Sequence, residues 1–183
     1  MPRLIVLNGP PACGKSTLAE RYVADHPLAL NLDIDRVRRL LGGWKADPLT
    51  AGLLARSIAL SAARTHLSGG HDVVVSQYLG RVEYLTRLAE VATETGADYH
   101  EIVLMDTKDR LLARFAARTA AAADPAHLDA QEILDRFGGT RQLEAMYDRL
   151  LLVIAARPHG LVVPAPEGEI DATYRDLLSR LDG

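Results

Sequence analysis

The sequence has little cysteine and little net charge, and both limits exclude classes of protein. A single cysteine, Cys13, cannot form a disulfide within the chain, which favours a reducing, intracellular setting. The formal net charge is −3 over 183 residues, so we do not expect a protein that depends on bulk attraction to nucleic acid or to an anionic membrane. Most of the basic residues are arginine, which suits bidentate recognition of phosphate.

Long apolar runs and a leader pattern are missing as well. No apolar run approaches the roughly 20 residues needed to span a bilayer, and the first residues lead directly into a strand pattern without signal-peptide features. The six histidines are scattered without ligand spacing, so we predict no histidine metal site. We therefore expect a soluble cytoplasmic protein, folded as one domain over residues 1–183 with a full core.

One motif is highly specific, a glycine-rich phosphate-binding loop of the pattern G-x-x-x-x-G-K-[ST]. It follows the apolar run Leu4–Leu7 and opens a helical pattern at Lys15, which is the setting that such loops need. The loop amides and the positive end of the helix then surround phosphate oxygens, Lys15 reaches the β- and γ-phosphates, and Ser16 ligates Mg²⁺. The sequence thus predicts binding of ATP and Mg²⁺. The predicted nucleotide-binding residues are Gly9, Pro10, Pro11, Ala12, Cys13, Gly14, Lys15, Ser16 and Thr17.

Hydrophobic patterns alternate between strand and helix along the chain. Apolar, β-branched runs predict strands at 3–8, 28–32, 72–76, 99–105 and 161–163. Helical spacing between glycine and proline breaks predicts helices at 15–25, 33–41, 48–68, 81–95, 108–120, 128–136, 140–156 and 170–181. This alternation predicts an α/β fold, a three-layer α/β/α sandwich around a five-stranded parallel sheet. Ligands of such sheets bind beyond the carboxyl ends of the strands.

Two aspartates follow the second predicted strand and therefore belong to the same edge of the sheet as the phosphate loop. Asp33 is a candidate to bind Mg²⁺, directly or through water. Asp35 is a candidate to accept the proton of an acceptor hydroxyl or to orient it for attack. The alternative is a helix start, in which acidic side chains cap the backbone and complement the dipole. That alternative explains one aspartate better than two.

The phosphate loop, the Asp33-x-Asp35 pair and a helix with Arg114 and Arg118 together resemble the small P-loop kinases. This group includes shikimate kinase, gluconate kinase, chloramphenicol phosphotransferase and polynucleotide 5′-kinase-like AAA-type ATP-binding proteins. The resemblance extends over most of the chain in layout, and the loop is its one highly specific motif. It implies a P-loop NTPase fold like that of the nucleoside-monophosphate kinases, with a small helical lid at about residues 119–139.

The resemblance also implies that arginines near the lid contact the transferring phosphate. Arg114 and Arg118 lie four residues apart on one predicted helix face and are the first candidates, Arg114 also as a nucleotide contact. The alternative is a solvated helix face paired to Asp106 or Asp109. Further candidates, at the far edge of the lid, are Arg136 and Arg141. In these kinases the adenine rests on the loop that corresponds to residues 164–168.

Other residues after the strands are candidates for the acceptor site. Arg36 is placed to line such a pocket. Arg56 has the spacing of an arginine that binds the substrate carboxylate in shikimate kinase, and the alternative is a surface arginine. Gln77 either hydrogen-bonds the substrate or ends the third strand as an ordinary polar residue. Trp44, the only tryptophan, either stacks on a planar substrate or packs under the helix 48–68.

The chain departs from these kinases at the end of the third strand. The segment Val75-Ser76-Gln77-Tyr78 carries no Walker-B aspartate, so metal binding is predicted to rest on Ser16 and Asp33. The glycine cluster that grips shikimate in shikimate kinase is also absent, which counts against shikimate as the substrate.

These features predict a kinase that transfers the γ-phosphate of Mg-ATP to a hydroxyl of a small molecule, such as an antibiotic, a nucleoside or a sugar acid. Lys15 and the loop amides would hold the phosphates, and Asp35 would receive the acceptor hydroxyl. The Asp- and Arg-rich segment 33–39 leaves a polynucleotide 5′-hydroxyl kinase open, with the net charge against it. The lack of a strand-end acid leaves open a nucleotide-dependent switch without an acceptor.

Overall fold

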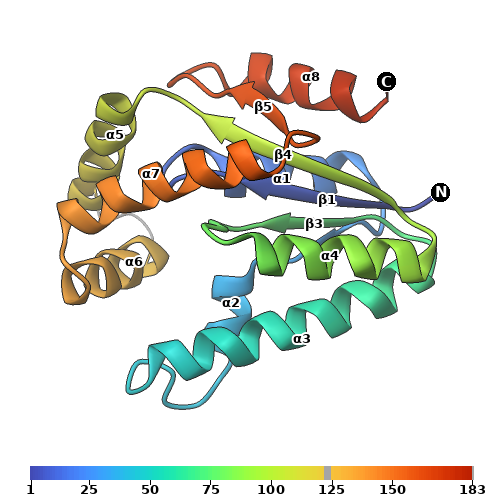
Figure 1. Ribbon diagram of the computed structural model, residues 1–183, viewed down its shortest axis with the longest axis horizontal. Coiled ribbons are helices and arrows are strands. Elements are labelled where there is room, and N and C mark those ends of the chain that lie inside the picture. Colours follow the sequence, from blue (N-terminus) through green and yellow to red (C-terminus); the bar gives the residue numbers. More distant parts are fainter. Residues whose placement is uncertain (122–124, 183) are drawn as a thin grey trace.

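The computed structural model describes residues 1–121 and 125–182, and a parallel sheet lies at its centre (Figure 1). The strands are β1 (Arg3–Asn8), β2 (Leu30–Asn31), β3 (Val73–Ser76), β4 (Asp98–Met105) and β5 (Leu161–Pro164). They pair in the order β2-β3-β1-β4-β5, and each of these pairings is parallel. The carboxyl ends of the strands therefore meet at one edge, where a ligand of such a sheet binds.

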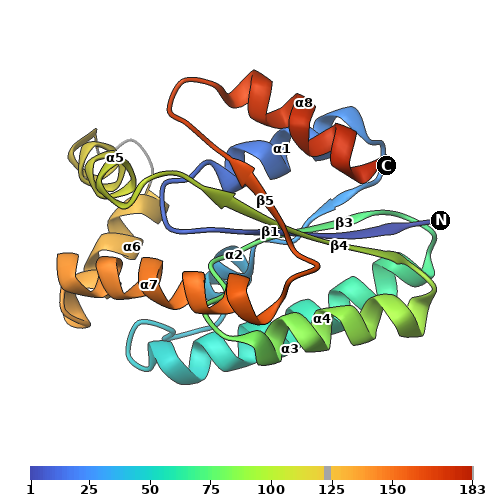
Figure 2. The same cartoon turned by 45° about the horizontal axis from the view of Figure 1, so that its top comes forward.

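Helices cover both faces of the sheet (Figure 2). On one face lie α1 (Lys15–Asp25) and α8 (Ile170–Leu181), and on the other lie α3 (Pro48–Ser68), α4 (Val82–Thr95) and α7 (Thr140–Ala156). This arrangement confirms the predicted three-layer sandwich with a five-stranded parallel sheet.

The sequence of β1 explains the two-sided core. Leu4 and Val6 pack with side chains of α3, α4 and α7, whereas Ile5 and Leu7 pack with side chains of α1 and α8. Successive side chains of a strand point to opposite faces, so a strand between two helical layers has to be apolar at each position. All four residues are completely buried, which fixes β1 and the loop that follows it.

The remaining helices lie at the carboxyl edge of the sheet and are α2 (Ile34–Arg39), α5 (Lys108–Ala121) and α6 (Pro125–Arg136). Phe115, Leu134 and Leu143 form a small apolar cluster that joins α5, α6 and α7. The region predicted as a lid therefore contains a helix packed against its neighbours. Residues 122–124 of this region lie outside the described residues.

Most predicted boundaries agree with the structure to within a residue or two, and the second strand and the sixth helix differ most. The strand covers 30–31 rather than 28–32 because Leu28 has a φ of 65° and the amide of Ala29 donates to the carbonyl of His26 at 3.1 Å, which forms a turn. The helix predicted at 128–136 begins at Pro125, a residue type that helices accept in their first turn. Within residues 1–121 and 125–182, no helix combines the length and apolar character that a bilayer span requires.

Candidate active site

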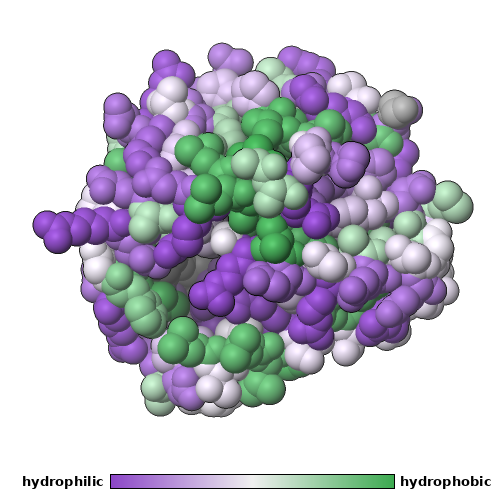
Figure 3. All heavy atoms as spheres, viewed as in Figure 1, coloured by the Kyte–Doolittle hydropathy of each residue, from purple (hydrophilic) through white to green (hydrophobic). Residues whose placement is uncertain are grey.

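A cavity of about 760 Å³ lies at the carboxyl edge of the sheet. Its walls come from the phosphate loop, α2, α3, the segment after β3, α5, α6 and α7. The space-filling view shows a hollow between α6 and α2 on this side of the molecule (Figure 3). The predicted site residues that line the cavity are Pro11, Ala12, Lys15, Ser16, Thr17, Asp33, Asp35, Arg36, Arg56, Gln77 and Arg118.

The phosphate loop has a backbone shape that needs glycine at its start. Gly9 has a φ of 151°, and a Cβ atom there would lie 2.6 Å from the Sγ of Cys13 and 2.7 Å from the carbonyl oxygen of Leu104. A larger residue would push the loop away from β4. Cys13 belongs to the same loop, and its side chain is buried.

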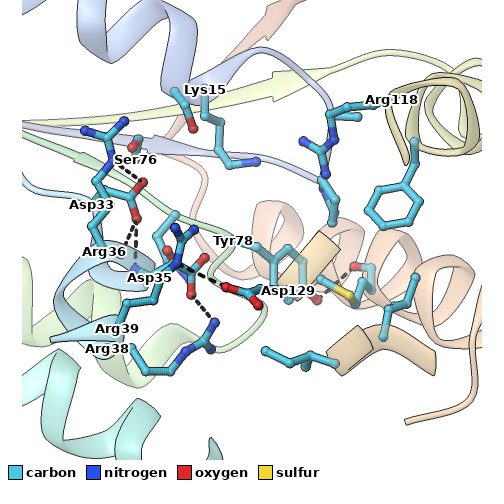
Figure 4. Close-up of a pocket in the computed structure, with 18 of the residues that line it drawn as sticks. Lys15, Asp33, Asp35, Arg36, Arg38, Arg39, Ser76, Tyr78, Arg118 and Asp129 are labelled. Atoms are coloured by element: carbon cyan, nitrogen blue, oxygen red, sulfur yellow. Dashed lines mark hydrogen bonds and ion pairs between the residues drawn. The ribbon is translucent and has the colours of Figure 1, made fainter. Parts of the chain in front are cut away.

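Lys15 lies over the loop that it is expected to serve. Its Nζ donates to the carbonyl oxygens of Gly9 at 2.9 Å and Pro10 at 2.7 Å. An ammonium group has three N–H donors and no acceptor. Lys15 can therefore donate to phosphate oxygens in place of these carbonyls. Figure 4 shows the Lys15 side chain on the same side of the cavity as Arg118.

Asn8 is a site residue that the sequence interpretation missed. Its completely buried side chain accepts from the amides of Gly9 and Leu79, both at 2.8 Å, and donates to the carbonyl of Leu79 at 3.0 Å. These bonds join the phosphate loop to the segment after β3 that carries Gln77. The available signal was a polar residue at the end of an otherwise apolar strand, directly before the loop.

Asp33 caps α2 and also faces the cavity. Its Oδ1 accepts from the amides of Asp35 at 2.8 Å and Arg36 at 3.1 Å. Burial raises the pKa of the Asp33 carboxyl, and the neighbouring charge of Asp35 acts in the same direction. The capping alternative is thus confirmed for Asp33. It does not displace the metal hypothesis, since the same residue lines the cavity.

Asp35 and the arginines of α2 form a row of ion pairs along one wall (Figure 4). The carboxylate of Asp35 lies 3.1 Å from Arg38, and Asp129 of α6 lies 3.7 Å from Arg39. Arg36 pairs with Glu20 at 2.9 Å and with Asp33 at 3.7 Å. The cavity therefore has a wall of alternating charge opposite Lys15 and Arg118.

Arg114 and Arg118 lie in different surroundings, although their spacing on one helix suggested a shared role. Arg118 lines the cavity, with its guanidinium 5.1 Å from the ring of Phe115. Arg114 lies outside the cavity lining, where it donates to the carbonyl of Ala165 at 2.8 Å and to Asp106 at 3.4 Å. Pairing with Asp106 was the alternative proposed for this helix face, and it holds for Arg114. A contact with Ala165 ties Arg114 to the loop 164–168 instead.

Other candidates also lie outside the cavity lining. Arg136 donates to Glu132 at 2.6 Å and to the carbonyl of Lys45 at 3.1 Å, while Arg141 does not line the cavity either. The ring of Trp44 lies 4.9 Å from the guanidinium of Arg38. Arg38 lines the cavity and Trp44 does not, so Trp44 contacts a cavity-lining arginine without lining the cavity itself.

The end of β3 presents hydroxyl and amide groups to the cavity. Ser76 is buried, and among the described residues its Oγ has no hydrogen-bond partner. Figure 4 shows Ser76 beside Asp33, as the pairing of β2 with β3 requires. Tyr78 is held in place because its hydroxyl donates to the carbonyl of Met146 at 2.9 Å.

The parallel sheet, the glycine-rich loop and the cavity beside it define the fold of the small P-loop kinases. The chain belongs to the AAA domain family, which matches residues 4–138. No curated protein matches the chain significantly in sequence.

Three solved structures have a similar fold. A protein from Chloroflexus aurantiacus j-10-fl has 19% identity and a TM-score of 0.67, covering 99% of this chain and 96% of that one. A gluconokinase from Sinorhizobium meliloti 1021 has 20% identity and a TM-score of 0.61, covering 98% and 93%. The tunicamycin resistance protein of Deinococcus radiodurans has 14% identity and a TM-score of 0.62, covering 99% and 96%. At these identities the likeness shows the fold.

Proposed function

We propose that the protein is an ATP-dependent phosphotransferase that moves the γ-phosphate of Mg-ATP to a hydroxyl of a small molecule, such as an antibiotic, a nucleoside or a sugar-like compound. The observation that carries this proposal is the shared cavity, which joins the phosphate loop to Asp35 on α2. A site for the nucleotide alone would not need the Asp35 carboxylate in the same cavity. The gluconokinase and the tunicamycin resistance protein, whose folds are similar, support the reaction class.

The residues of the chain divide into two groups around the transferring phosphate. Lys15, the loop amides and Arg118 hold the phosphate oxygens and stabilise the negative charge that develops on them. Asp35 orients the acceptor hydroxyl and takes its proton as the oxygen attacks phosphorus. Arg114 acts from outside the cavity, because its bond to Ala165 orders the loop on which the adenine rests.

The donor set on the phosphate side fits Mg²⁺. Ser16 and Ser76 offer hydroxyl oxygens and Asp33 offers a carboxylate, and oxygen ligands are the kind that Mg²⁺ takes. The buried Ser76 hydroxyl, without a partner among the described residues, is the feature that an oxygen-ligated ion or its water would satisfy. An ion held by these residues would supply positive charge against the β- and γ-phosphates.

The described residues contain no cluster of three or more His, Cys, Asp or Glu able to hold a metal ion. We therefore propose that the ion arrives with the nucleotide. A cytoplasmic location is part of this proposal and rests on the single cysteine.

The test is ADP formation from Mg-ATP with a panel of neutral and charged hydroxyl acceptors and a 5′-hydroxyl oligonucleotide. We expect one small acceptor to stimulate ADP formation, and Asp35→Asn to lower kcat with that acceptor by about 10²- to 10⁴-fold while ADP affinity is kept. Asp98→Asn, at the opposite end of the sheet on β4, is the matched control and should leave kcat unchanged.

Two outcomes contradict the proposal. Stimulation by the oligonucleotide alone, weakened steeply by salt, would indicate a polynucleotide kinase. Tight nucleotide binding without stimulation by any acceptor would indicate a nucleotide-dependent switch.

A further inference from the structure

A second cavity, of about 460 Å³, lies between α5, α6 and α7, which pack together beyond the carboxyl edge of the sheet (Figure 1). Phe115, Leu134 and Leu143 line it and are buried. Ala116 and Thr140 also line it and are exposed, so the cavity opens to solvent on their side. Its volume falls in the range of about 300 to 1,000 Å³ that is usual for cavities that bind small organic molecules.

The lining of the second cavity is uncharged and mainly apolar. None of the described residues that line it is acidic or basic, in contrast to the active-site cavity. Thr119 donates to Oε1 of Gln131 at 3.2 Å, and Nε2 of Gln131 donates to Asp135 at 2.7 Å. Because these polar groups of the wall already have partners, binding has to come from apolar contact, and a charged ligand would lose hydration without gaining an ion pair. The cavity therefore favours an uncharged, largely apolar molecule.

The second cavity shares a wall with the active site, since Phe115 and Leu134 line both cavities. Arg118 lines the active-site cavity, and its guanidinium lies 5.1 Å from the Phe115 ring. Ala12 of the phosphate loop packs against the small apolar cluster of Phe115, Leu134 and Leu143. A ligand that contacts this cluster from the second cavity is thus one side chain away from two groups at the phosphate site.

The direction of the coupling follows from the packing. Three buried side chains form the cluster that joins α5, α6 and α7, and a cavity beside them leaves them without contacts on one side. A molecule that fills this space stabilises the arrangement in which Arg118 lines the active-site cavity.

We propose that the second cavity is a regulatory site for a small, uncharged, largely apolar molecule, and that its occupation strengthens nucleotide binding at the phosphate loop. By linkage, the nucleotide strengthens binding of this molecule by the same factor. This inference goes beyond the proposed phosphotransfer, because it requires a nucleotide in the phosphate loop but no acceptor.

A matched pair of fluorinated probes tests the chemistry of the site. 5-Fluoroindole is neutral and bicyclic, and 5-fluoroindole-2-carboxylate has the same rings with one negative charge. Fluorine NMR measures their binding to the full chain without background, because the protein contains no fluorine. We expect 5-fluoroindole to bind in the second cavity at least about 10-fold more tightly than the carboxylate.

Two variants of α5 locate the bound probe. Ala116→Phe places a larger side chain at the exposed opening of the second cavity and should abolish binding of 5-fluoroindole there. Ala117→Phe is the matched control, because Ala117 is also exposed and lines neither cavity. It should keep the binding. Both substitutions are at exposed positions of one helix, so both variants should fold.

Calorimetric titration with Mg²⁺ and a non-hydrolysable ATP analogue measures the coupling. Saturating 5-fluoroindole should lower the Kd of the analogue by about 5-fold in the wild type and in Ala117→Phe, and leave it unchanged in Ala116→Phe. Phe115→Leu should keep an apolar wall and lose most of the coupling, since it removes the ring next to Arg118.

Three results would overturn the inference. They are the absence of 5-fluoroindole binding, equal binding to the wild type and Ala116→Phe, and bound 5-fluoroindole that leaves the Kd of the analogue unchanged or raises it. If the analogue alone does not bind, the nucleotide site fails and the inference fails with it. If the analogue binds and the probe lowers its Kd as expected, but no acceptor is phosphorylated, the proposed function fails and the regulatory site stands.

Discussion

Asp33 shows how one carboxylate serves both a helix and a cavity. As the cap of α2 it accepts two backbone amides, and as a cavity residue it keeps a charge in a buried position. Burial disfavours that charge and raises the pKa of the carboxyl. A structural role alone would be filled as well by asparagine, which caps helices as effectively as aspartate without a charge. The charge is therefore the feature that the proposed Mg²⁺ site explains.

This argument predicts how stability depends on pH at Asp33. The folded protein holds a proton on Asp33 more tightly than the unfolded chain, so the free energy of unfolding falls as pH rises between the unfolded and the folded pKa. Asp33→Asn should keep the cap and remove this loss. Measured by urea denaturation, the free energy of unfolding of the variant should exceed that of the wild type by more at neutral pH than at acid pH.

Asp47 provides the matched control, because it caps α3 and a hydrogen bond from Thr50 lowers its pKa. Its carboxylate adds stability above the unfolded pKa, and this stability is lost as the pH falls through the folded pKa. Asp47→Asn should therefore cost stability at neutral pH, and the cost should shrink in acid. If the change in the free energy of unfolding at neutral pH has the same sign for both variants, Asp33 is not a carboxylate that is destabilised by burial.

At the scale of elements, local patterns were readable from the sequence and long-range partners were not. The phosphate loop and the helices at 48–68, 140–156 and 170–181 have the predicted bounds, because each depends on neighbours along the chain. The partners of Arg114 and Arg118 could not be derived from their spacing, since these depend on where the loop 164–168 and Phe115 lie.

The contact between α6 and the segment after α2 is another long-range feature that the sequence did not reveal. Lys45 binds Asp129 at 2.6 Å and Glu132 at 3.0 Å, and Arg136 donates to the carbonyl of Lys45 at 3.1 Å. Residues 45 and 136 are 91 positions apart, so no local pattern links them. Because Asp129 lines the cavity, these bonds hold α6 against its acceptor side.

Breaking this contact should affect the acceptor more than the nucleotide. Lys45→Met removes the ion pairs to Asp129 and Glu132, and we expect the KM for the acceptor to rise by roughly 2- to 5-fold, as partly exposed pairs are weak. The KM for ATP should change little. Salt should raise the acceptor KM of the wild type and have less effect on the variant, because it screens the same charges.

Steady-state kinetics over a range of ionic strength provide the measurement. Arg64→Met is a suitable control, since it breaks an ion pair of 2.7 Å with Glu94 on the outer helices and should leave both KM values unchanged. Equal effects of Lys45→Met on the ATP and acceptor KM values would contradict a role of this contact in holding the acceptor side.

At the scale of the whole molecule, the active-site cavity is lined by residues from both faces of the sheet. The phosphate loop packs through Cys13 into the apolar cluster between the sheet, α1 and α8. Asp33 and Arg56 lie next to residues of the apolar cluster on the other face, between the sheet, α3 and α4. The small cluster of Phe115, Leu134 and Leu143 anchors α5, α6 and α7. A nucleotide in the cavity would contact residues attached to all three clusters.

Nucleotide binding should therefore stabilise the whole fold. At a concentration 100-fold above its Kd, Mg-ATP adds about 2.7 kcal/mol to the free energy of unfolding. For a chain of this size, that corresponds to a rise in Tm of roughly 5 to 10 °C. Without nucleotide, Lys15→Ala should unfold at a temperature close to that of the wild type, because the Lys15 ammonium donates to two loop carbonyls and to the sulfur of Cys13, all within the phosphate loop. With Mg-ATP the variant should lose most of the rise, and so should the wild type with Mg²⁺ alone, since the described residues contain no metal cluster of their own. An equal rise in Tm for the wild type and Lys15→Ala, measured by scanning calorimetry, would place the nucleotide away from the glycine-rich loop.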